Sequence, residues 1–409
     1  MRTYSLPFLR RMPSPIISAR LLKIFNAFSC IILPPQERIR DCWTLAPHCG
    51  TNFPLSKYCI QPYGSWEAVD EEVKSLGLDG LEVIADPDDL ADDIPLSLVA
   101  GYHMTFYVDW VDFWRHDEKA LMRKYRSWEE IESVYRGRQP EDLMRHFRDD
   151  LATAQRLKAP YLVFHVSDVS LEEGYTYRWL HTDKEVLDAS IEFINELLRG
   201  AEPTFDFLVE NQWWPGFTFT DPEKTEYLLS HINYPRLGIM LDTGHLMNTN
   251  WKIKSQWDGI KYILEMIEKH GELSKSIYGL HFHQSMSGKY CKENVGKVPD
   301  DFPLEYFQEF GRNYSHILQI DRHHPWTMEE CVMILDRTQP KYLTHELTSS
   351  FYRKKTDSIR NQMRVIRRGY EMGLDKLTIP EMEERRKKAK QKPEPTGNWF
   401  LDHVIRGIS

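Results

Sequence analysis

Short apolar segments alternate with amphipathic helical segments along most of this chain, and this alternation is what most constrains its fold. A helical pattern over residues 66–76 is followed by a Gly77-Leu78-Asp79-Gly80 break and by an apolar strand at residues 81–84. Pairs of this kind recur up to residue 370. Strands that alternate with helices form a parallel sheet covered by helices, which is either open or closed into a barrel.

The same pattern locates the remaining elements. Further strands are predicted at residues 99–106, 161–165, 207–210, 237–241, 277–283 and 342–346, with a first strand somewhere within residues 52–61. Helices are predicted at residues 141–157, 183–198, 221–230, 256–270, 327–335 and 357–370. The strands number eight, as in a (β/α)8 barrel.

Polar residues at the strand ends decide between an open sheet and a barrel. Neither G-x-G-x-x-G nor G-x-x-x-x-G-K-[ST] follows any predicted strand, so a nucleotide-binding open sheet is not indicated. Instead, successive strands end in His103, His165, Glu210, Asp242, His281 and Glu346. In a barrel these ends meet at one mouth, where active sites of this fold lie. We therefore predict an α/β fold, a (β/α)8 TIM barrel with long loops at its carboxyl-terminal mouth and extensions at both termini.

The two ends of the chain differ in composition from its middle. Residues 1–45 carry basic residues before the first acidic one, and the Ile-Leu-Pro-Pro that follows their apolar run is a poor cleavage site for a secretory signal. After residue 376 the chain is dense in charge, and an amphipathic stretch that includes Trp399 follows. We expect an N-terminal extension at residues 1–45, a catalytic barrel at residues 46–376 and a charged C-terminal tail at residues 377–409.

Charge and cysteine content narrow the partners and the compartment. The net charge is -9, which argues against a protein that coats nucleic acid. The 6 cysteines form no C-x-x-C pair, so neither a disulfide framework nor a cysteine zinc site is indicated. A reducing, cytoplasmic compartment fits this composition best.

The sharpest local motif is Leu241-Asp242-Thr243-Gly244-His245. Gly244 permits a tight turn after the strand, so the carboxylate and the imidazole can enter one metal shell. Asp242 is equally suited to cap the next helix, and the motif alone leaves both interpretations open.

Other strands add carboxylates and imidazoles. Glu210 and Glu346 each end an apolar strand, where an unpaired carboxylate would be costly. His281 and His283 share one face of their strand, so both can point into the barrel. This mixture of oxygen and imidazole donors favours a divalent metal and is compatible with Zn, Mn, Fe or Co.

The segments Val209-Glu210-Asn211, Leu280-His281 and His345-Glu346, together with the Asp242 motif, resemble the xylose isomerase-like barrels. That superfamily includes sugar isomerases, sugar epimerases and the endonuclease IV branch. The resemblance to the epimerases implies that Glu210, Asp242, His281 and Glu346 bind one divalent metal, and that the two glutamates act as acid and base.

Additional residues resemble the endonuclease IV branch. His103 and His165 stand where that branch has two more histidines, and Asp321-Arg322-His323-His324 resembles its Asp-Arg-His motif. The resemblance implies one to three divalent ions per chain and catalytic roles for Glu210, His245 and Glu346. The implied ligands are His103, His165, Glu210, Asp242, His245, His281, Asp321, His323 and Glu346.

Bulky aromatic residues stand after several strands, where the endonuclease branch has small, glycine-rich turns. We expect the substrate to be bound by Tyr107, Trp110, Trp213, Trp214, His283 and Trp326. The loops at residues 109–140 and 167–182 are long enough to fold over the mouth as lids, and residues 284–321 form a third insertion.

The sequence therefore predicts a divalent-metal-dependent isomerase or epimerase that acts on a small, carbohydrate-like molecule. Three alternatives stay open. They are an endonuclease IV-like multinuclear phosphodiesterase that cleaves abasic DNA, a multinuclear iron-dependent oxidative enzyme, and a barrel that only binds a ligand. The aromatic residues at the mouth argue against duplex DNA as the substrate, and no membrane partner is expected.

Overall fold

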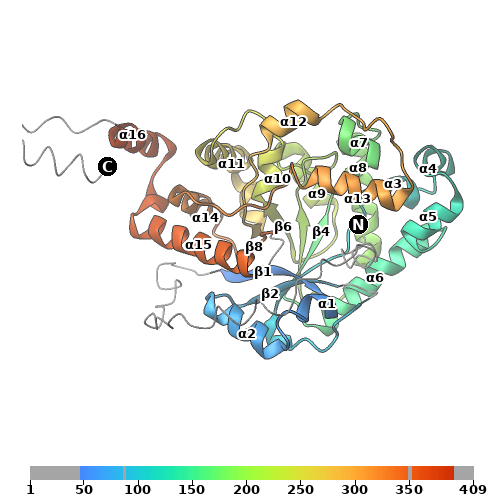
Figure 1. Ribbon diagram of the computed structural model, residues 1–409, viewed down its shortest axis with the longest axis horizontal. Helices are drawn as coiled ribbons and strands as arrows, with labels where there is room; N and C mark the ends of the chain where they lie inside the picture. The colour runs from blue at the N-terminus through green and yellow to red at the C-terminus, as the bar shows by residue number, and fades with distance from the viewer. Residues whose placement is uncertain (1–46, 86–88, 349–351, 391–409) are drawn as a thin grey trace, which may run out of the picture.

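In the computed structural model, which describes residues 47–85, 89–348 and 352–390, parallel strands close into a barrel. The strands follow one another around it in chain order, and the last pairs again with the first. They are β1 (His48–Leu55), β2 (Gly80–Ala85), β3 (Val99–His103), β4 (Tyr161–His165), β5 (Asp206–Glu210), β6 (Leu237–Asp242), β7 (Ile277–His281) and β8 (Tyr342–His345). The predicted (β/α)8 TIM barrel is therefore confirmed (Figure 1).

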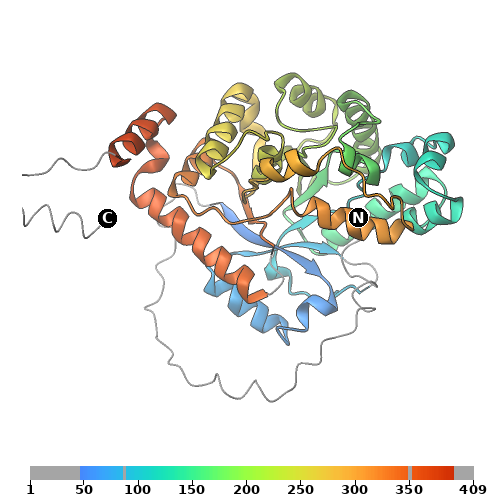
Figure 2. The same ribbon diagram turned by 45° about the horizontal axis from the view of Figure 1, so that its top comes forward.

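Helices cover the outside of this barrel and extend over one end of it (Figures 1 and 2). Those of the first half are α1 (Lys57–Ile60), α2 (Trp66–Ser75), α3 (Val111–Trp114), α4 (Glu118–Lys124), α5 (Trp128–Tyr135), α6 (Pro140–Arg156), α7 (Leu171–Thr176) and α8 (Asp183–Leu197). Those of the second half are α9 (Pro222–His231), α10 (Thr243–Asn248), α11 (Gln256–His270), α12 (Gly288–Asn294), α13 (Tyr306–Ile317), α14 (Val332–Thr338), α15 (Tyr352–Glu371) and α16 (Ile379–Lys390). Because both faces of the strands are covered, the strands are apolar runs rather than alternating ones.

The element bounds agree with the sequence in most places and differ in a few. The bounds of β4 and α11 are those predicted. The first strand is an exception, because it begins at His48 and ends at Leu55, earlier than residues 52–61. The predicted helix at residues 327–335 begins only at Val332, because a short 3-10 turn at Glu329–Cys331 takes its first part.

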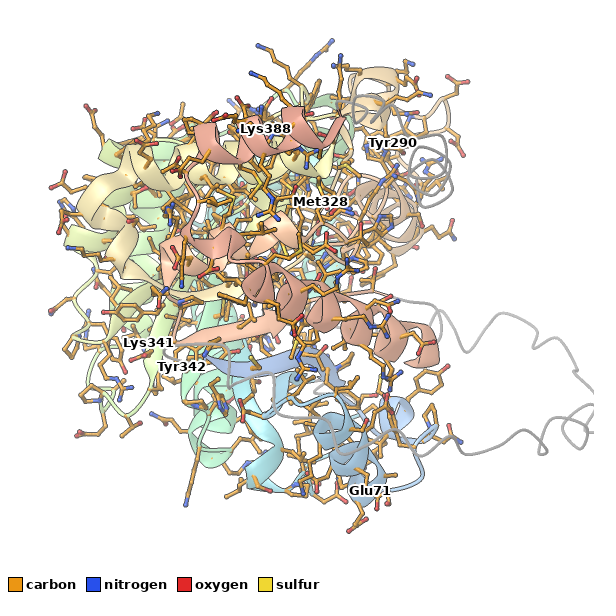
Figure 3. All side chains as sticks on the ribbon, turned by 90° about the vertical axis from the view of Figure 1, so that its left-hand side faces the viewer. Glu71, Tyr290, Met328, Lys341, Tyr342 and Lys388 are labelled. Atoms are coloured by element: carbon orange, nitrogen blue, oxygen red, sulfur yellow. The ribbon has the colours of Figure 1, made fainter. Side chains whose placement is uncertain are left out.

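The long segments predicted as lids and as an insertion contain helices. The segment after β3 holds α3, α4 and α5, the one after β4 holds α7, and the one after β7 holds α12 and α13. All of them leave the barrel at the carboxyl ends of its strands. In Figure 3, Tyr290 on α12 lies on this side, whereas Lys341 and Tyr342 mark the opposite, amino end of β8. These helices therefore build up one mouth of the barrel.

A tyrosine fills the barrel interior below that mouth. A Cβ atom at Gly101 would overlap the ring of Tyr161, so only glycine leaves room for the ring at this position. The Tyr161 hydroxyl donates to Glu82 Oε2 at 2.7 Å and is 2.9 Å from Thr344 Oγ1. Strands β2, β4 and β8 are thus joined by a buried polar contact directly beneath the strand ends.

The first part of the expected C-terminal tail packs on the barrel. Met382 of α16 is buried, and the Arg386 guanidinium lies 5.2 Å from the centroid of the Trp257 ring on α11. The predicted N-terminal extension and the amphipathic stretch with Trp399 lie outside the described residues. No helix within the described ranges is long and apolar enough to cross a membrane.

Candidate metal centre

The polar residues at the strand ends converge on the mouth of the barrel in three groups. Within each group, one donor atom per residue lies within 4.8 Å of the others. The first group is His103, His165 and Glu210; the second is Glu210, Asp242, His281 and Glu346; the third is His245, His283, Asp321 and His323. All nine ligand positions expected from the resemblance belong to these groups, and Glu210 belongs to two of them.

The first group joins the ends of β3, β4 and β5. The Nδ1–H of His103 donates a hydrogen bond to the carbonyl oxygen of Met104 at 2.8 Å. The lone pair of Nε2 is therefore available to bind a metal ion. The two Nε2 atoms of His103 and His165 lie 3.0 Å apart. They are 3.4 Å and 3.1 Å from Glu210 Oε2. Three donors that face one point in this way can hold a divalent ion and leave a coordination position open.

The second group is built around His281 at the end of β7. His281 Nδ1 is 3.0 Å from Glu346 Oε2, 3.4 Å from Glu210 Oε2 and 3.8 Å from Asp242 Oδ2. Three carboxylates and one imidazole make this the most oxygen-rich of the three groups, which suits a hard divalent cation.

The third group lies beside the second, since His245 Nδ1 is 3.6 Å from Asp242 Oδ2. His245 Nε2 is 3.2 Å from Asp321 Oδ2, and His323 Nε2 is 2.5 Å from the same oxygen. His323 Nδ1–H donates to the carbonyl oxygen of Glu346 at 3.0 Å, which fixes its ring. Asp321 is therefore buried in the site and does not lie on the outer surface.

Buried atoms without hydrogen bonds show that the residues fit metal ions. Glu210 Oε2, His281 Nδ1 and Glu346 Oε2 are buried, and although His281 Nδ1 lies 3.0 Å from Glu346 Oε2 and 3.4 Å from Glu210 Oε2, none of the three atoms makes a hydrogen bond with the described residues. An unmatched carboxylate oxygen in such a place is costly, and a cation at their common centre would compensate it. The donor chemistry and the separations suit a transition metal.

The imidazoles and carboxylates also shift one another's pKa. Burial alone would raise the pKa of Glu210, but the charges of His165 and His281 hold it well below its usual range. Burial alone would lower the pKa of His281, but the surrounding carboxylates raise it well above the ordinary value. Glu210 is thus ionised at neutral pH, and an ion that binds beside His281 would displace a proton from that ring.

Two functional residues were missed by the sequence reasoning. Glu82 of β2 has Oε1 at 3.0 Å from His281 Nε2, so the carboxylate holds the ring with Nδ1 toward the metal position. Asn211 accepts from the Asp242 backbone N–H at 2.8 Å through Oδ1, and its Nδ2 donates to the Asp242 carbonyl oxygen at 3.1 Å. Glu82 could have been found, because it interrupts an apolar strand as Glu210 does.

A cavity of about 200 Å³ opens onto the ligand groups. Tyr107, Trp213 and Trp214, all expected to bind substrate, line it, and so do Phe106 and Tyr314. The Trp213 indole N–H donates to the Tyr177 hydroxyl at 3.0 Å, which ties this wall of the cavity to the segment after β4.

The other residues expected to bind substrate lie elsewhere, which corrects the predicted pocket. Trp110 is buried between the two lids, and its indole N–H donates to the carbonyl oxygen of Ser167 at 2.8 Å. Trp326 is fully buried and packs near Phe282 in the core. His283 is buried behind the ligands, 2.8 Å from Asp242 Oδ2. The sequence could not show these directions, because they depend on how the inserted helices pack.

A buried cluster of charges joins the two lids, and we call it the lid cluster: Asp109, Asp112, Lys124, Asp168 and His181. Lys124 Nζ is 2.6 Å from Asp109 Oδ1 and 2.7 Å from Asp112 Oδ2. His181 Nε2 is 3.1 Å from Asp112 Oδ1 and 3.8 Å from Asp168 Oδ2. The cluster therefore connects the segment after β3 to the segment after β4.

Alkaline pH is expected to loosen the lids through His181. The hydrogen bond with Asp112 raises the pKa of His181 above its ordinary value. The protonated ring therefore stabilises the lid cluster fully below about pH 6.5, and this stabilisation is lost as the pH rises through the folded-state pKa. Asp168 also favours the charged form, whereas Lys124 opposes it. Hydrogen exchange of α3 and α7, corrected for intrinsic rates, should be faster at alkaline than at acidic pH. His181→Gln should remove this difference, and a difference that survives the substitution would contradict the assignment.

Solved structures and a family model resemble this chain. Endonuclease IV from Thermus thermophilus is 15% identical with a TM-score of 0.45, over 79% of this chain and 100% of that chain. An L-ribulose 3-epimerase is 10% identical with a TM-score of 0.47, over 86% of this chain and 100% of that chain. No curated protein sequence is a significant match. The model of the xylose isomerase-like TIM barrel matches residues 71–368, from within α2 to within α15.

Proposed function

We propose that this chain, which belongs to the xylose isomerase-like TIM barrel family, is a multinuclear metalloenzyme that hydrolyses a phosphoester bond in a small molecule. The observation that carries the proposal is the position of Glu210 in two ligand groups, with a third group beside them. A carboxylate shared in this way is the arrangement expected of neighbouring ions that act on one substrate.

The engagement of Glu210 also favours hydrolysis over isomerisation. Its Oε1 is 3.0 Å from His245 Nδ1, and its Oε2 faces His165 at 3.1 Å. Isomerisation or epimerisation requires a carboxylate that is free to take a proton from a substrate carbon. With an ion in each of the two groups to which Glu210 belongs, neither of its oxygens would be free for that role, whereas hydrolysis needs Glu210 only as a ligand.

The metal ligands, the residues that orient them and the aromatic residues of the cavity have different roles in the proposed reaction. Divalent ions held by the three groups would lower the pKa of water and neutralise charge on phosphoryl oxygens. Glu82 and Asn211 keep His281 and Asp242 in their ligand orientations. Trp213 and Trp214 exclude bulk water from the cavity and offer aromatic surface to the substrate.

The cavity favours a small substrate over duplex DNA. Among the described residues that line it, none is a lysine or an arginine. Binding to a duplex depends on many contacts between basic side chains and phosphates. A compact cavity of about 200 Å³ with aromatic walls instead suits a small molecule whose phosphate is neutralised by the ions.

Isomerisation or epimerisation of a small carbohydrate-like molecule is the second candidate. One observation favours it: the second group alone supplies a complete single-metal site with two glutamates, Glu210 and Glu346. If only the second group holds an ion, Glu210 would not also have to bind an ion in the first group.

Metal content together with turnover of model substrates tests the proposal. Protein purified without chelators should contain close to one ion for each of the three groups and should hydrolyse bis(p-nitrophenyl) phosphate. Incubation with D-fructose should give no epimer, and a duplex oligonucleotide with one abasic site should stay intact. A single ion per chain with conversion of D-fructose would replace hydrolysis by the second candidate.

A further inference from the structure

We propose that Lys355 binds an anionic group of the substrate in a second cavity beside the metal centre. The inference rests on the proposed hydrolysis and names the class of its substrate. That class is a phosphoester with a further ester group that is apolar along its length and acidic at its end.

The second cavity, which we call the outer cavity, has a volume of about 710 Å³ and lies between β1, α2 and α15 (Figure 1). It is larger than the cavity of about 200 Å³ at the ligand groups, which we call the metal cavity. The apolar side chains that line the outer cavity include Phe53, Tyr63, Val69, Val73, Leu76, Leu81, Leu347 and Ile359. Walls of this kind suit the apolar part of a small molecule.

The two cavities adjoin at the carboxyl end of β1. Asn52, Pro54 and Thr348 line both of them. Glu346, a ligand of the second group, lines the metal cavity, and the next residue, Leu347, lines the outer cavity. A phosphoester with its phosphate at the ligand groups can therefore extend another ester group past Asn52 into the outer cavity.

Lys355 of α15 stands close to this junction. Its ammonium donates to the backbone carbonyl oxygen of Asn52 at 2.5 Å and to Asn52 Oδ1 at 2.6 Å. An ammonium has three N–H donors, and none of the described residues accepts the third one. Lys355 is half-buried and is the only cationic side chain in the described lining of the outer cavity. One donor of a sheltered cation is thus available to a ligand.

This ammonium also lacks a counter-ion. Lys355 forms no ion pair with a carboxylate in the described part of the chain. Glu72, a carboxylate that lines the same cavity, accepts instead from the Thr356 hydroxyl. Burial lowers the pKa of Lys355 to about 8, and the charge of Glu346 opposes this change. Because bound ions would neutralise Glu346, an anionic group of the ligand would then be the partner that compensates the ammonium.

A series of phosphodiesters tests the inference in the whole, metal-loaded protein. Each ester has a p-nitrophenyl leaving group and a linear alkyl group that ends in either a carboxylate or a methyl group, and the alkyl chain is lengthened stepwise. At the length that reaches Lys355, kcat/KM should be about 10-fold higher or more for the carboxylate ester than for its methyl partner, because a charge-assisted hydrogen bond is gained. No preference at any length would overturn the inference.

Variants of the lysine show whether Lys355 causes the preference. Lys355→Met keeps an apolar stem and removes the charge, so it should cancel the preference, mainly by raising KM for the carboxylate ester. Lys355→Arg should restore part of the preference. Lys74→Met replaces an exposed lysine of α2 that does not line the cavity, and it should behave as wild type. A preference that survives in folded Lys355→Met would mean that the bound ions attract the carboxylate, and would overturn the inference.

Binding of octanoate separates this inference from the proposed function, because it needs no turnover. Calorimetric titration should show similar affinity in wild type and Glu210→Gln, and about 10-fold weaker binding or less in Lys355→Met. Val73→Phe narrows the outer cavity without touching Lys355 and should also weaken binding, so it serves as the test if Lys355→Met does not fold.

The results of this titration distinguish the two proposals. Octanoate that is lost from Glu210→Gln but retained by Lys355→Met would be bound by the metal ions, which would overturn the inference. Octanoate binding that depends on Lys355, in a protein that hydrolyses none of the esters, would support the Lys355 site and overturn only the proposed hydrolysis.

Discussion

Glu210→Gln is expected to empty the first and second groups of the metal centre and to lower the hydrolysis of bis(p-nitrophenyl) phosphate by about 10³-fold or more. Glu210 is the residue shared by the first and second groups, so its replacement removes a negative ligand from two positions at once. An amide is neutral and offers one weak oxygen donor in place of two carboxylate oxygens. Metal analysis should show that only the ion of the third group remains, and steady-state kinetics should show the loss of activity.

The same strand supplies the control for this substitution. Asp206 is a buried carboxylate at the amino end of β5, where it accepts from Arg236 Nε at 2.8 Å. Asp206→Asn removes a comparable charge far from the mouth, and it should lower thermal stability without changing the metal content. Three ions in Glu210→Gln would mean that Glu210 is not a shared ligand.

Lys124→Met is expected to destabilise the protein by about 3–5 kcal/mol, because it leaves buried carboxylates without their counter-charge. In the lid cluster the Lys124 ammonium contacts Asp109 and Asp112 within 2.7 Å. Burial, opposed by the charge of Lys124, raises the pKa of Asp109 to about 6. Urea denaturation followed by circular dichroism measures the loss.

Two comparisons show whether the charge is responsible. Lys119 is exposed on the same helix, and Lys119→Met should change stability by less than about 0.5 kcal/mol. The destabilisation by Lys124→Met should also shrink as the pH falls, because protonation of Asp109 relieves the unpaired charge. A loss that does not vary with pH would point to lost packing of the lysine stem instead.

The fold could be predicted because its signals are local and repeated. Residues 161–165 and 256–270 are a strand and a helix with the predicted bounds, since their hydrophobic periods are clear and no insertion interrupts them. Residues 111–114 and 288–294, for which the sequence pattern predicts no helix, form short helices. Helices of this length are stabilised by tertiary packing rather than by their own residues, so the pattern carries little sign of them.

Part of the candidate site could likewise be predicted from the sequence, and part of it could not. The structure brings His103 and Asp242 to the mouth because each ends a strand of the barrel, and topology fixes where those ends meet. Asp321 reaches the same mouth from the segment that follows α13, where the Asp-Arg-His motif and not the strand pattern predicted it. Trp110 and Trp326 are buried in other contacts, because the direction of a side chain on an inserted segment depends on neighbours distant in sequence. Glu82 lies on the second strand, before the first of the motifs that carried the resemblance, although its position between the apolar Leu81 and Val83 gave the same signal as that of Glu210.

The closed order of the strands fixes when the site can exist during synthesis. Its donors are spread from β3 to the residue after β8, and the barrel is complete only when β8 pairs with β1. Glu346 follows that last strand, so a nascent chain lacks part of the second group until nearly all of the barrel has left the ribosome. Because an assembled ligand set does not exist in the unfolded chain, any uptake of metal by these groups would be a late event in maturation. The ions that fill the site would therefore be those available to the folded barrel, and not those present while the chain is being synthesised.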